Sequence, residues 1–219
     1  MSEPKAELGV VIIHGMGAPT KYFASPLVDG INDLLGDDAA AVAFESCFWS
    51  PILQNGEDEV WRRLEASKTP MELGFAREWI VGALGDPTGY LSGYERSGVP
   101  AMHRVHECFA DALGRVEQRL ADPAGSPIVV LAHSLGTVVV TNYLWNLERA
   151  AGEVGKPESV DPHPGRAALR KTFGEGPAQE LKTLAGLITF GCNIPLFLPP
   201  SPHYECVRFP RPALPAKLT

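Results

Sequence analysis

The sequence predicts an α/β protein, with a three-layer α/β/α sandwich built around a mainly parallel sheet. Three short apolar runs, at 8–14, 127–133 and 184–191, predict buried strands. The runs are continuous rather than alternating, which is typical of parallel strands whose sheet is covered by helices on both faces. Helical patterns lie between the runs, and strands that alternate with helices favour a parallel sheet.

The segment after the first strand predicts a helix over 25–36. Ser25 is expected at its N-cap, Pro26 at its first helical position and Gly36 at its end, because these residue types favour those positions. The apolar segment that follows, at 40–50, is a weaker candidate for a fourth strand.

Two longer helices are predicted around the second strand run. Residues 101–120 carry apolar side chains at spacings of three and four, which indicates an amphipathic helix lying on the sheet. Residues 136–150 begin apolar nearly all round, so the first turns of this helix are expected to be central and buried. The apolar positions of the helix predicted at 101–120 are Met102, Val105, Phe109, Leu113, Val116 and Leu120.

A length of 219 residues suits a single domain over 1–219. Two regions depart from the strand–helix alternation. Residues 151–183 are rich in glycine and proline, with short helices expected near 166–172 and 177–183. This composition favours a surface loop, and the functional alternative is a lid or insertion over a pocket. The tail at 195–219 holds seven prolines, so it predicts neither a central strand nor a long helix.

Composition excludes some classes of function. The formal net charge is -7 and no basic run occurs, which argues against a protein that coats nucleic acid. The N-terminus lacks the features of a signal peptide, and the late apolar stretch LAGLITFGCNIPLFLPP is too interrupted to predict a membrane span. A soluble, cytoplasmic protein is therefore expected. Its thiols are expected to be reduced, since no C-x-x-C pair occurs among Cys47, Cys108, Cys192 and Cys206.

The stretch VVLAHSLGTVVV, residues 129–140, places Ser134 between a predicted strand and a predicted helix. A sharp turn there lifts a serine hydroxyl clear of the sheet and points the first helical N–H groups at the same spot. Such a turn crowds its neighbours, and small residues stand two positions before and after it, at Ala132 and Gly136. The alternative is an ordinary serine at the start of a helix, and the strand–turn–helix context favours a nucleophile.

A second glycine-bearing segment, HGMG at 14–17, directly follows the first strand. Glycines let the backbone approach a ligand closely, so this segment suits one side of an oxyanion hole. It is a weak candidate for a dinucleotide-binding loop, because Thr20 stands where the third glycine of that fingerprint is required.

The pair VVIIHGMG and VVLAHSLG resembles the α/β-hydrolase superfamily of serine esterases and lipases. The resemblance extends over about 8–198, including LITFGCNIPLF, and an alanine replaces the first glycine of G-x-S-x-G. It implies a hydrolase-like fold with Ser134 as the nucleophile and the backbone N–H groups of Met16 and Leu135 as oxyanion donors. It also implies that His14 and His133 support the turns rather than act as bases. Gly15 and Gly17 are expected, with them, to belong to the oxyanion and binding part of the site.

In this superfamily an acid and then a histidine follow the serine along the chain. Two histidines follow Ser134, and His203 is a better-placed base than His163 because it lies beyond the last predicted strand. The acid has no clear candidate, since Asn193 occupies one usual position and could orient an imidazole only by a hydrogen bond. The sheet therefore looks C-terminally short. The expectation is a truncated form of a longer hydrolase whose acid and base lie beyond Thr219.

These observations predict a serine hydrolase that cleaves an ester or another acyl compound through an acyl-enzyme on Ser134. The main alternative is a non-catalytic protein of hydrolase fold that binds a ligand or partner, and the third is a phosphate- or nucleotide-binding protein. A small-molecule acyl substrate is expected, with no cofactor, metal or nucleic acid. The histidines in HRVHE, His103 and His106, do not stand in a zinc-peptidase order. The sequence leaves the oligomeric state open.

Overall fold

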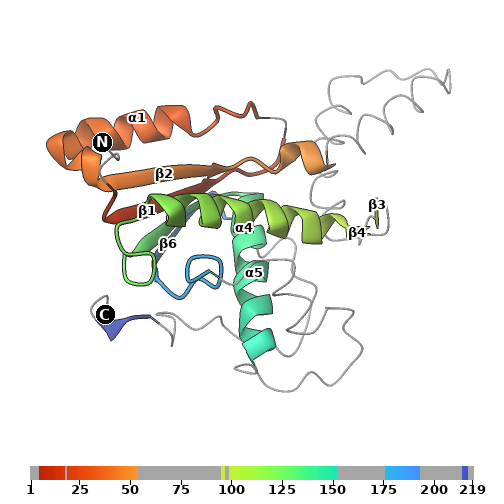
Figure 1. The fold of residues 1–219 in the computed structure, drawn as a ribbon. Coiled ribbons are helices and arrows are strands. Elements are labelled where there is room, and N and C mark those ends of the chain that lie inside the picture. Colours follow the sequence, from red (N-terminus) through yellow and green to blue (C-terminus); the bar gives the residue numbers. More distant parts are fainter. Residues whose placement is uncertain are drawn as a thin grey trace, which may run out of the picture.

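Four parallel strands form the central sheet of the computed structural model (Figure 1). Their order is β2-β1-β5-β6, and every neighbouring pair is parallel. The α/β class and the parallel sheet are therefore confirmed, as are the four predicted strand segments. Their bounds are Leu8–Ile13 for β1, Val42–Cys47 for β2, Ile128–His133 for β5 and Leu184–Phe190 for β6.

The structure describes residues 5–17, 19–53, 95–96, 99–151, 176–192 and 214–216. Its helices include α1 (Ser25–Leu35), the 3-10 helix η1 (Gly36–Ala41), α4 (Ala101–Arg119) and α5 (Leu135–Ala151). A small antiparallel pair, β3 (Glu95–Arg96) and β4 (Val99–Pro100), precedes α4. The predicted helix at 166–172, and most of the regions 151–183 and 195–219, lie outside the described residues.

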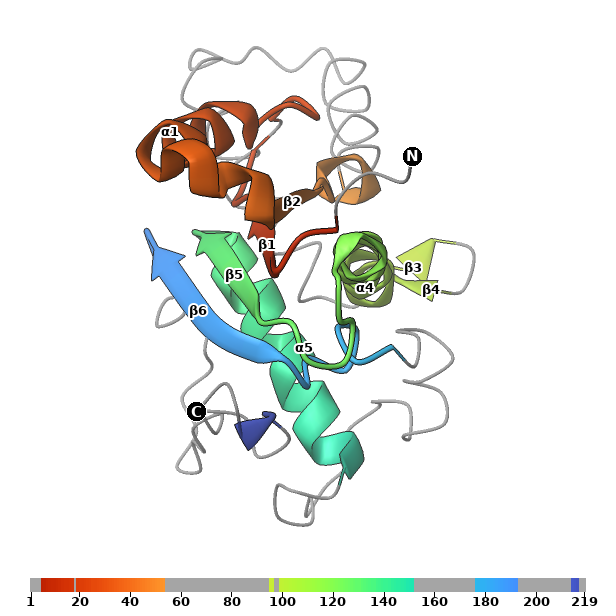
Figure 2. The same cartoon turned by 60° about the vertical axis from the view of Figure 1, so that its left-hand side comes forward.

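Helices pack on both faces of β1, whose side chains alternate between them (Figure 2). Val10 and Ile12 pack in a cluster with Val28 and Ile31 of α1. The residues between them, such as Val11, belong to the larger core cluster, to which α4 and α5 contribute. This alternation is the period of two expected for a strand, and both faces of β1 are apolar because both are covered.

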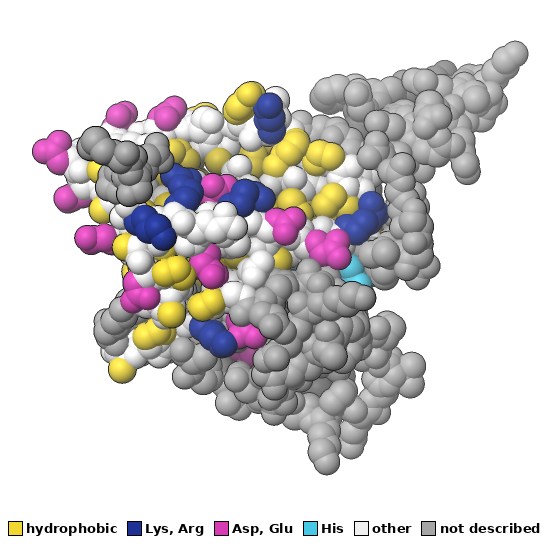
Figure 3. Space-filling model, viewed as in Figure 1, with side chains coloured by type: hydrophobic (Ala, Val, Ile, Leu, Met, Phe, Trp, Pro, Cys, Tyr) yellow, Lys and Arg dark blue, Asp and Glu magenta, His cyan; other side chains and the backbone are white. Residues whose placement is uncertain are grey.

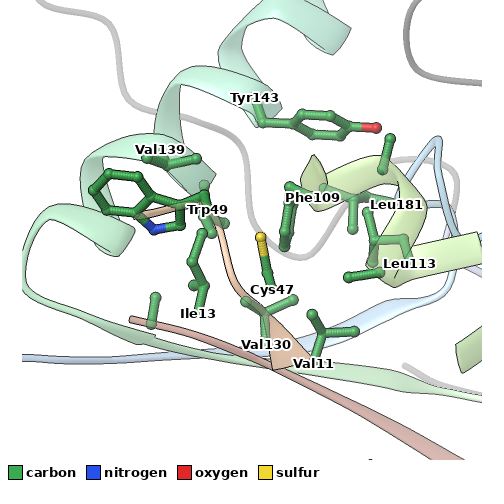
Figure 4. Packing of buried hydrophobic residues seen from close by; sticks show 14 of the residues in the cluster. Val11, Ile13, Cys47, Trp49, Phe109, Leu113, Val130, Val139, Tyr143 and Leu181 are labelled. Carbon is green, nitrogen blue, oxygen red and sulfur yellow. The ribbon is translucent and has the colours of Figure 1, made fainter. Parts of the chain in front are cut away.

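The main core lies between the sheet and the pair α4 and α5 (Figure 4). Phe109 and Leu113 of α4 and Tyr143 of α5 are fully buried there. Phe109 and Tyr143 meet edge to face, with ring centroids 5.1 Å apart. The apolar face predicted for 101–120 is therefore the face that α4 turns to the sheet.

Two local predictions are wrong. Ser25 is the first residue of α1 rather than its N-cap, which is Ala24. A turn precedes the helix, and the backbone N–H of Ser25 already donates to the Tyr22 carbonyl at 3.0 Å, so a side-chain cap is not needed at this end. Gly36 does end α1, with φ +57.

The second wrong prediction is the helix at 177–183, where the structure has consecutive turns. The backbone N–H of Lys182 donates to the Pro177 carbonyl, five residues back. Leu181 has φ +51, in the left-handed region, so the right-handed helix cannot pass through it. The buried Leu181 and Ala178 nevertheless anchor these turns in the core.

Two arginines of α4 cap the outer edge of β2, which is an edge strand of the described sheet. Arg119 donates to the Phe44 carbonyl at 2.8 Å, and Arg115 donates to the Ser46 carbonyl at 3.3 Å. Both arginines also pair with Glu45 at 3.1 Å. Such contacts blunt an edge that would otherwise pair with another strand. In Figure 3, the charged side chains along α1 are acidic, whereas acidic and basic side chains are interspersed over α4.

None of the helices that the structure describes combines the length and the hydropathy needed to cross a lipid bilayer.

Candidate active site

The loop after β1 and the turn after β5 meet at one edge of the sheet. Parallel strands carry their carboxyl ends to the same edge, and β1 and β5 are neighbours. The chain leaves β1 for β2 on one side, and it leaves β5 for β6 on the other. The gap between β1 and β5 is thus a point where the strand order reverses, and open parallel sheets bind ligands at such points.

Ser134 is held in an unusual backbone conformation. It is a non-glycine residue with φ +50, between the last residue of β5 and the first of α5. Two hydrogen bonds fix the turn: the Ser134 N–H donates to the Phe190 carbonyl at 3.0 Å, and the Thr137 N–H donates to the Ser134 carbonyl at 2.9 Å. The left-handed region costs an L-residue about 1–2 kcal/mol, and such strain concentrates at functional sites.

The small residues around Ser134 are required by close backbone contacts. A Cβ at Gly136 would lie 2.5 Å from the His14 carbonyl oxygen and 3.0 Å from that of Ile13. Ala132 is fully buried, and its carbonyl accepts the Thr137 hydroxyl at 3.3 Å. Gly136 therefore relieves crowding, as predicted. The atoms for which it leaves room belong to the backbone at the end of β1, not to its own helix.

The glycine-bearing loop lies directly against Ser134. A Cβ at Gly15 would stand 2.5 Å from the Ser134 Cβ, so only glycine fits there. Gly17, with φ +96, turns the loop away. Met16 follows Gly15 in this loop, and Leu135 begins α5, where its N–H has no acceptor within the helix. The structure thus places the two proposed oxyanion segments on either side of one serine.

His14 is a buried structural residue of this loop. Its Nε2 accepts the backbone N–H groups of Trp49 and Ser50, at 3.2 and 3.3 Å. The proton therefore sits on Nδ1, which donates to the Gly15 carbonyl at 2.7 Å. Trp49 stacks on the ring, with centroids 4.6 Å apart, and donates its indole N–H to the His14 carbonyl at 3.1 Å. Both ring nitrogens are engaged in holding the loop.

Burial lowers the pKa of His14 from 6.5 to about 4. The unfolded chain then binds a proton more readily than the folded one, so stability from this group is complete above pH 6.5 and is lost as the pH falls toward 4. The full loss of unfolding free energy from this group is at most about 3 kcal/mol. Urea unfolding between about pH 7.5 and 4.5 measures how steeply the unfolding free energy falls with pH. His14→Asn should flatten it, and an unchanged slope would contradict the assignment.

His133 is exposed at the position just before Ser134. Its ring stacks on Phe190, with centroids 5.1 Å apart and planes 29° from parallel. Two glycines border it: a Cβ at Gly15 would lie 3.1 Å from its Nδ1, and one at Gly191 would lie 3.2 Å from its Nε2. His133, Phe190 and Gly191 thus form one rim beside Ser134.

The structure does not place every predicted residue. His203, His163 and Asn193 lie outside the described residues, so the predicted base and its partner are not located. Among the described residues, no cluster of three or more histidine, cysteine or acidic side chains is arranged to hold a metal ion.

Sequence reasoning missed two parts of the site, Trp49 and the rim formed by Phe190 and Gly191. Trp49 lies within the segment at 40–50 that is the weaker strand candidate, and nothing in that pattern points to the site. The rim follows the last predicted strand, so its position at the same sheet edge was the available signal.

No protein-family model, curated protein or solved structure matches this chain. The site therefore rests on its own geometry. That geometry is a strained serine between strand and helix, with a glycine loop from the neighbouring strand packed against it.

Proposed function

We propose that this protein is a serine hydrolase that cleaves an ester or another acyl compound through an acyl-enzyme on Ser134. The fold that goes with this proposal is a three-layer, α/β-hydrolase-like sandwich. One observation carries it: Ser134 has φ +50 at the carboxyl end of β5, and the Gly15 backbone packs against it. A strained serine at that position is the arrangement that presents a nucleophile.

The chemistry follows from the position of Ser134. Its oxygen attacks the acyl carbon while a base takes the hydroxyl proton, and a tetrahedral oxyanion forms. The N–H groups of Met16 and Leu135 would stabilise that charge, one from each segment beside the serine. The alcohol then leaves with a proton from the same base, and water releases the acyl group.

The base must be a group other than His14, because both nitrogens of that ring are engaged and burial lowers its pKa to about 4, so the ring takes up a proton poorly. His203 remains the candidate that the sequence offers. Catalysis also needs a carboxylate or amide to orient the base, and the region of Asn193 and the chain after it are where we would look for it.

The rim beside Ser134 favours a non-polar acyl group. Phe190 keeps 41% of its surface exposed although its ring stacks on His133, next to Ser134. Pockets for small molecules are mostly apolar, with a few polar groups that set orientation. A small acyl ester whose apolar part contacts Phe190 fits this arrangement. Thiols that are free at Cys47, Cys108 and Cys192 are consistent with the cytoplasm as its place of action.

A fluorophosphonate probe tests the proposal, because it reacts covalently with an activated serine. The full chain is expected to be labelled, and Ser134→Ala should lower labelling at least about 100-fold. Ser25→Ala is a matched control, since Ser25 is an exposed serine at a helix start without the strained turn.

The outcomes separate the alternatives. Labelling that survives Ser134→Ala would remove Ser134 from the mechanism. A folded chain that takes no label would favour the non-catalytic, ligand-binding alternative.

A further inference from the structure

Two cysteines from distant parts of the chain meet beside the segment that supports the site. Cys47 is the last residue of β2, and Cys108 lies in the middle of α4. Their sulfur atoms are 3.8 Å apart, with the Cys47 thiol donating to the Cys108 sulfur. Figure 4 shows Cys47 among the core side chains, next to Phe109 of α4.

The two thiols differ in access and in charge. Cys47 is fully buried, whereas Cys108 is only half-buried. The hydrogen bond from Cys47 lowers the pKa of Cys108, assisted by the positive charge of Arg115. Burial raises the pKa of Cys47. A half-buried thiol of lowered pKa next to a fully buried thiol is the arrangement of a redox-sensitive pair.

We propose that Cys47 and Cys108 form a reversible disulfide in response to a peroxide. The Cys108 sulfur gives up its proton and attacks a peroxide oxygen, and the O–O bond breaks. A sulfenic acid forms on Cys108, and the departing oxygen takes up that proton and leaves as water or an alcohol. The Cys47 thiol then attacks that sulfur, the S–O bond breaks, and water leaves with the Cys47 proton. Both thiols are thereby oxidised by two electrons in total, and the peroxide is reduced.

The disulfide would act on the support of the candidate site. It brings the sulfur atoms from 3.8 Å to about 2.05 Å, so the packing between the end of β2 and α4 must rearrange around them. Cys47 is two residues from Trp49, which stacks on His14 and donates to its carbonyl. His14 in turn precedes Gly15, whose backbone touches Ser134. Oxidation is therefore expected to shift the loop at 14–17, and its effect on activity rests on the proposed function.

The test uses the full chain with Cys192→Ser and Cys206→Ser, so that only the proposed pair remains. Treatment with hydrogen peroxide should lower the intact mass by two hydrogen atoms, block alkylation of both thiols, and give a cross-linked peptide of Cys47 and Cys108. A reducing agent should reverse all three changes. With Cys47→Ser in the same background, dimedone should trap a sulfenic acid on Cys108. With Cys108→Ser, the buried Cys47 should remain unoxidised.

The outcomes test the disulfide and its effect on the site separately. Peroxide-treated protein that keeps both thiols alkylatable, or that carries only sulfenic or sulfinic acid, would overturn the disulfide. The effect of the disulfide on the loop at 14–17 is read from the amide NMR shifts of Gly15 and Ser134, which should change on oxidation and return on reduction. Unchanged shifts would mean that the disulfide does not reach the site. Failure of the proposed hydrolase function would instead show as absent fluorophosphonate labelling in the reduced protein, with mass and NMR results unaffected.

Discussion

A chain with glycine at position 134 is expected to lose hydrolysis while folding more stably than the same chain with alanine there. Both substitutions remove the hydroxyl, so each should lower turnover roughly 10³-fold or more if Ser134 is the nucleophile. They differ in backbone freedom. Position 134 has φ +50, which alanine adopts at a cost of about 1–2 kcal/mol and glycine adopts freely.

The comparison isolates the strain because glycine and alanine both lack every contact of the serine hydroxyl. After the greater entropy of unfolded glycine is subtracted, Ser134→Gly should be about 0.5–1 kcal/mol more stable than Ser134→Ala. Urea unfolding of the two variants measures this difference, and ester turnover measures the first effect. Equal stabilities would mean that the turn holds no strain, and turnover that persists in both variants would refute the nucleophile assignment.

The sheet was predictable because its signal is local. Each strand is a short apolar run, and continuous runs identify strands with both faces covered. The segment at 40–50 was weaker because Glu45 interrupts its apolar run. In the structure Glu45 lies on the same face of β2 as Ala43 and Cys47, where two arginines of α4 hold it. The sequence cannot show that contact, since Arg115 and Arg119 reach β2 only after α4 has packed on the sheet.

The candidate site also has parts that the sequence shows locally and contacts that only the folded chain brings together. Ser134 and the small residues around it carry a local signature, and the loop at 14–17 follows a recognisable strand. The contacts that hold them together are not local. Trp49 stacks on His14 across 35 positions, and Cys47 meets Cys108 across 61. These pairings depend on which strands are neighbours, and the order β2-β1-β5-β6 is a tertiary result that no single run encodes.

The same dependence explains the two local errors. Ser25 and the turns at 177–183 both have compositions that suit a helix terminus or a helix. At the first, a preceding turn already supplies the acceptor for the Ser25 N–H. At the second, burial of Ala178 and Leu181 in the core holds the backbone in turns, and tertiary packing overrides the local preference.

Two glycine-to-alanine changes in helices are expected to have opposite effects on stability. Gly30 lies in α1, where an added Cβ would meet no other atom within 4 Å, so Gly30→Ala should stabilise the fold by about 0.5–1 kcal/mol through helix propensity. Gly136 lies in the first turn of α5, where a Cβ would be 2.5 Å from the His14 carbonyl oxygen. Gly136→Ala should therefore destabilise by about 2–3 kcal/mol.

The contact at Gly136 cannot relax cheaply, because the obstructing atoms are backbone oxygens of Ile13 and His14 at the end of a central strand. Relief would require α5 to move away from β1, which would also separate Ser134 from the loop at 14–17. Gly136→Ala should thus lose fluorophosphonate labelling along with stability, whereas Gly30→Ala should keep full labelling. Thermal and urea unfolding of both variants check the signs. A Gly136→Ala chain as stable as Gly30→Ala would show that the turn is not clamped between β1 and α5, and the geometry assigned to the serine would fail with it.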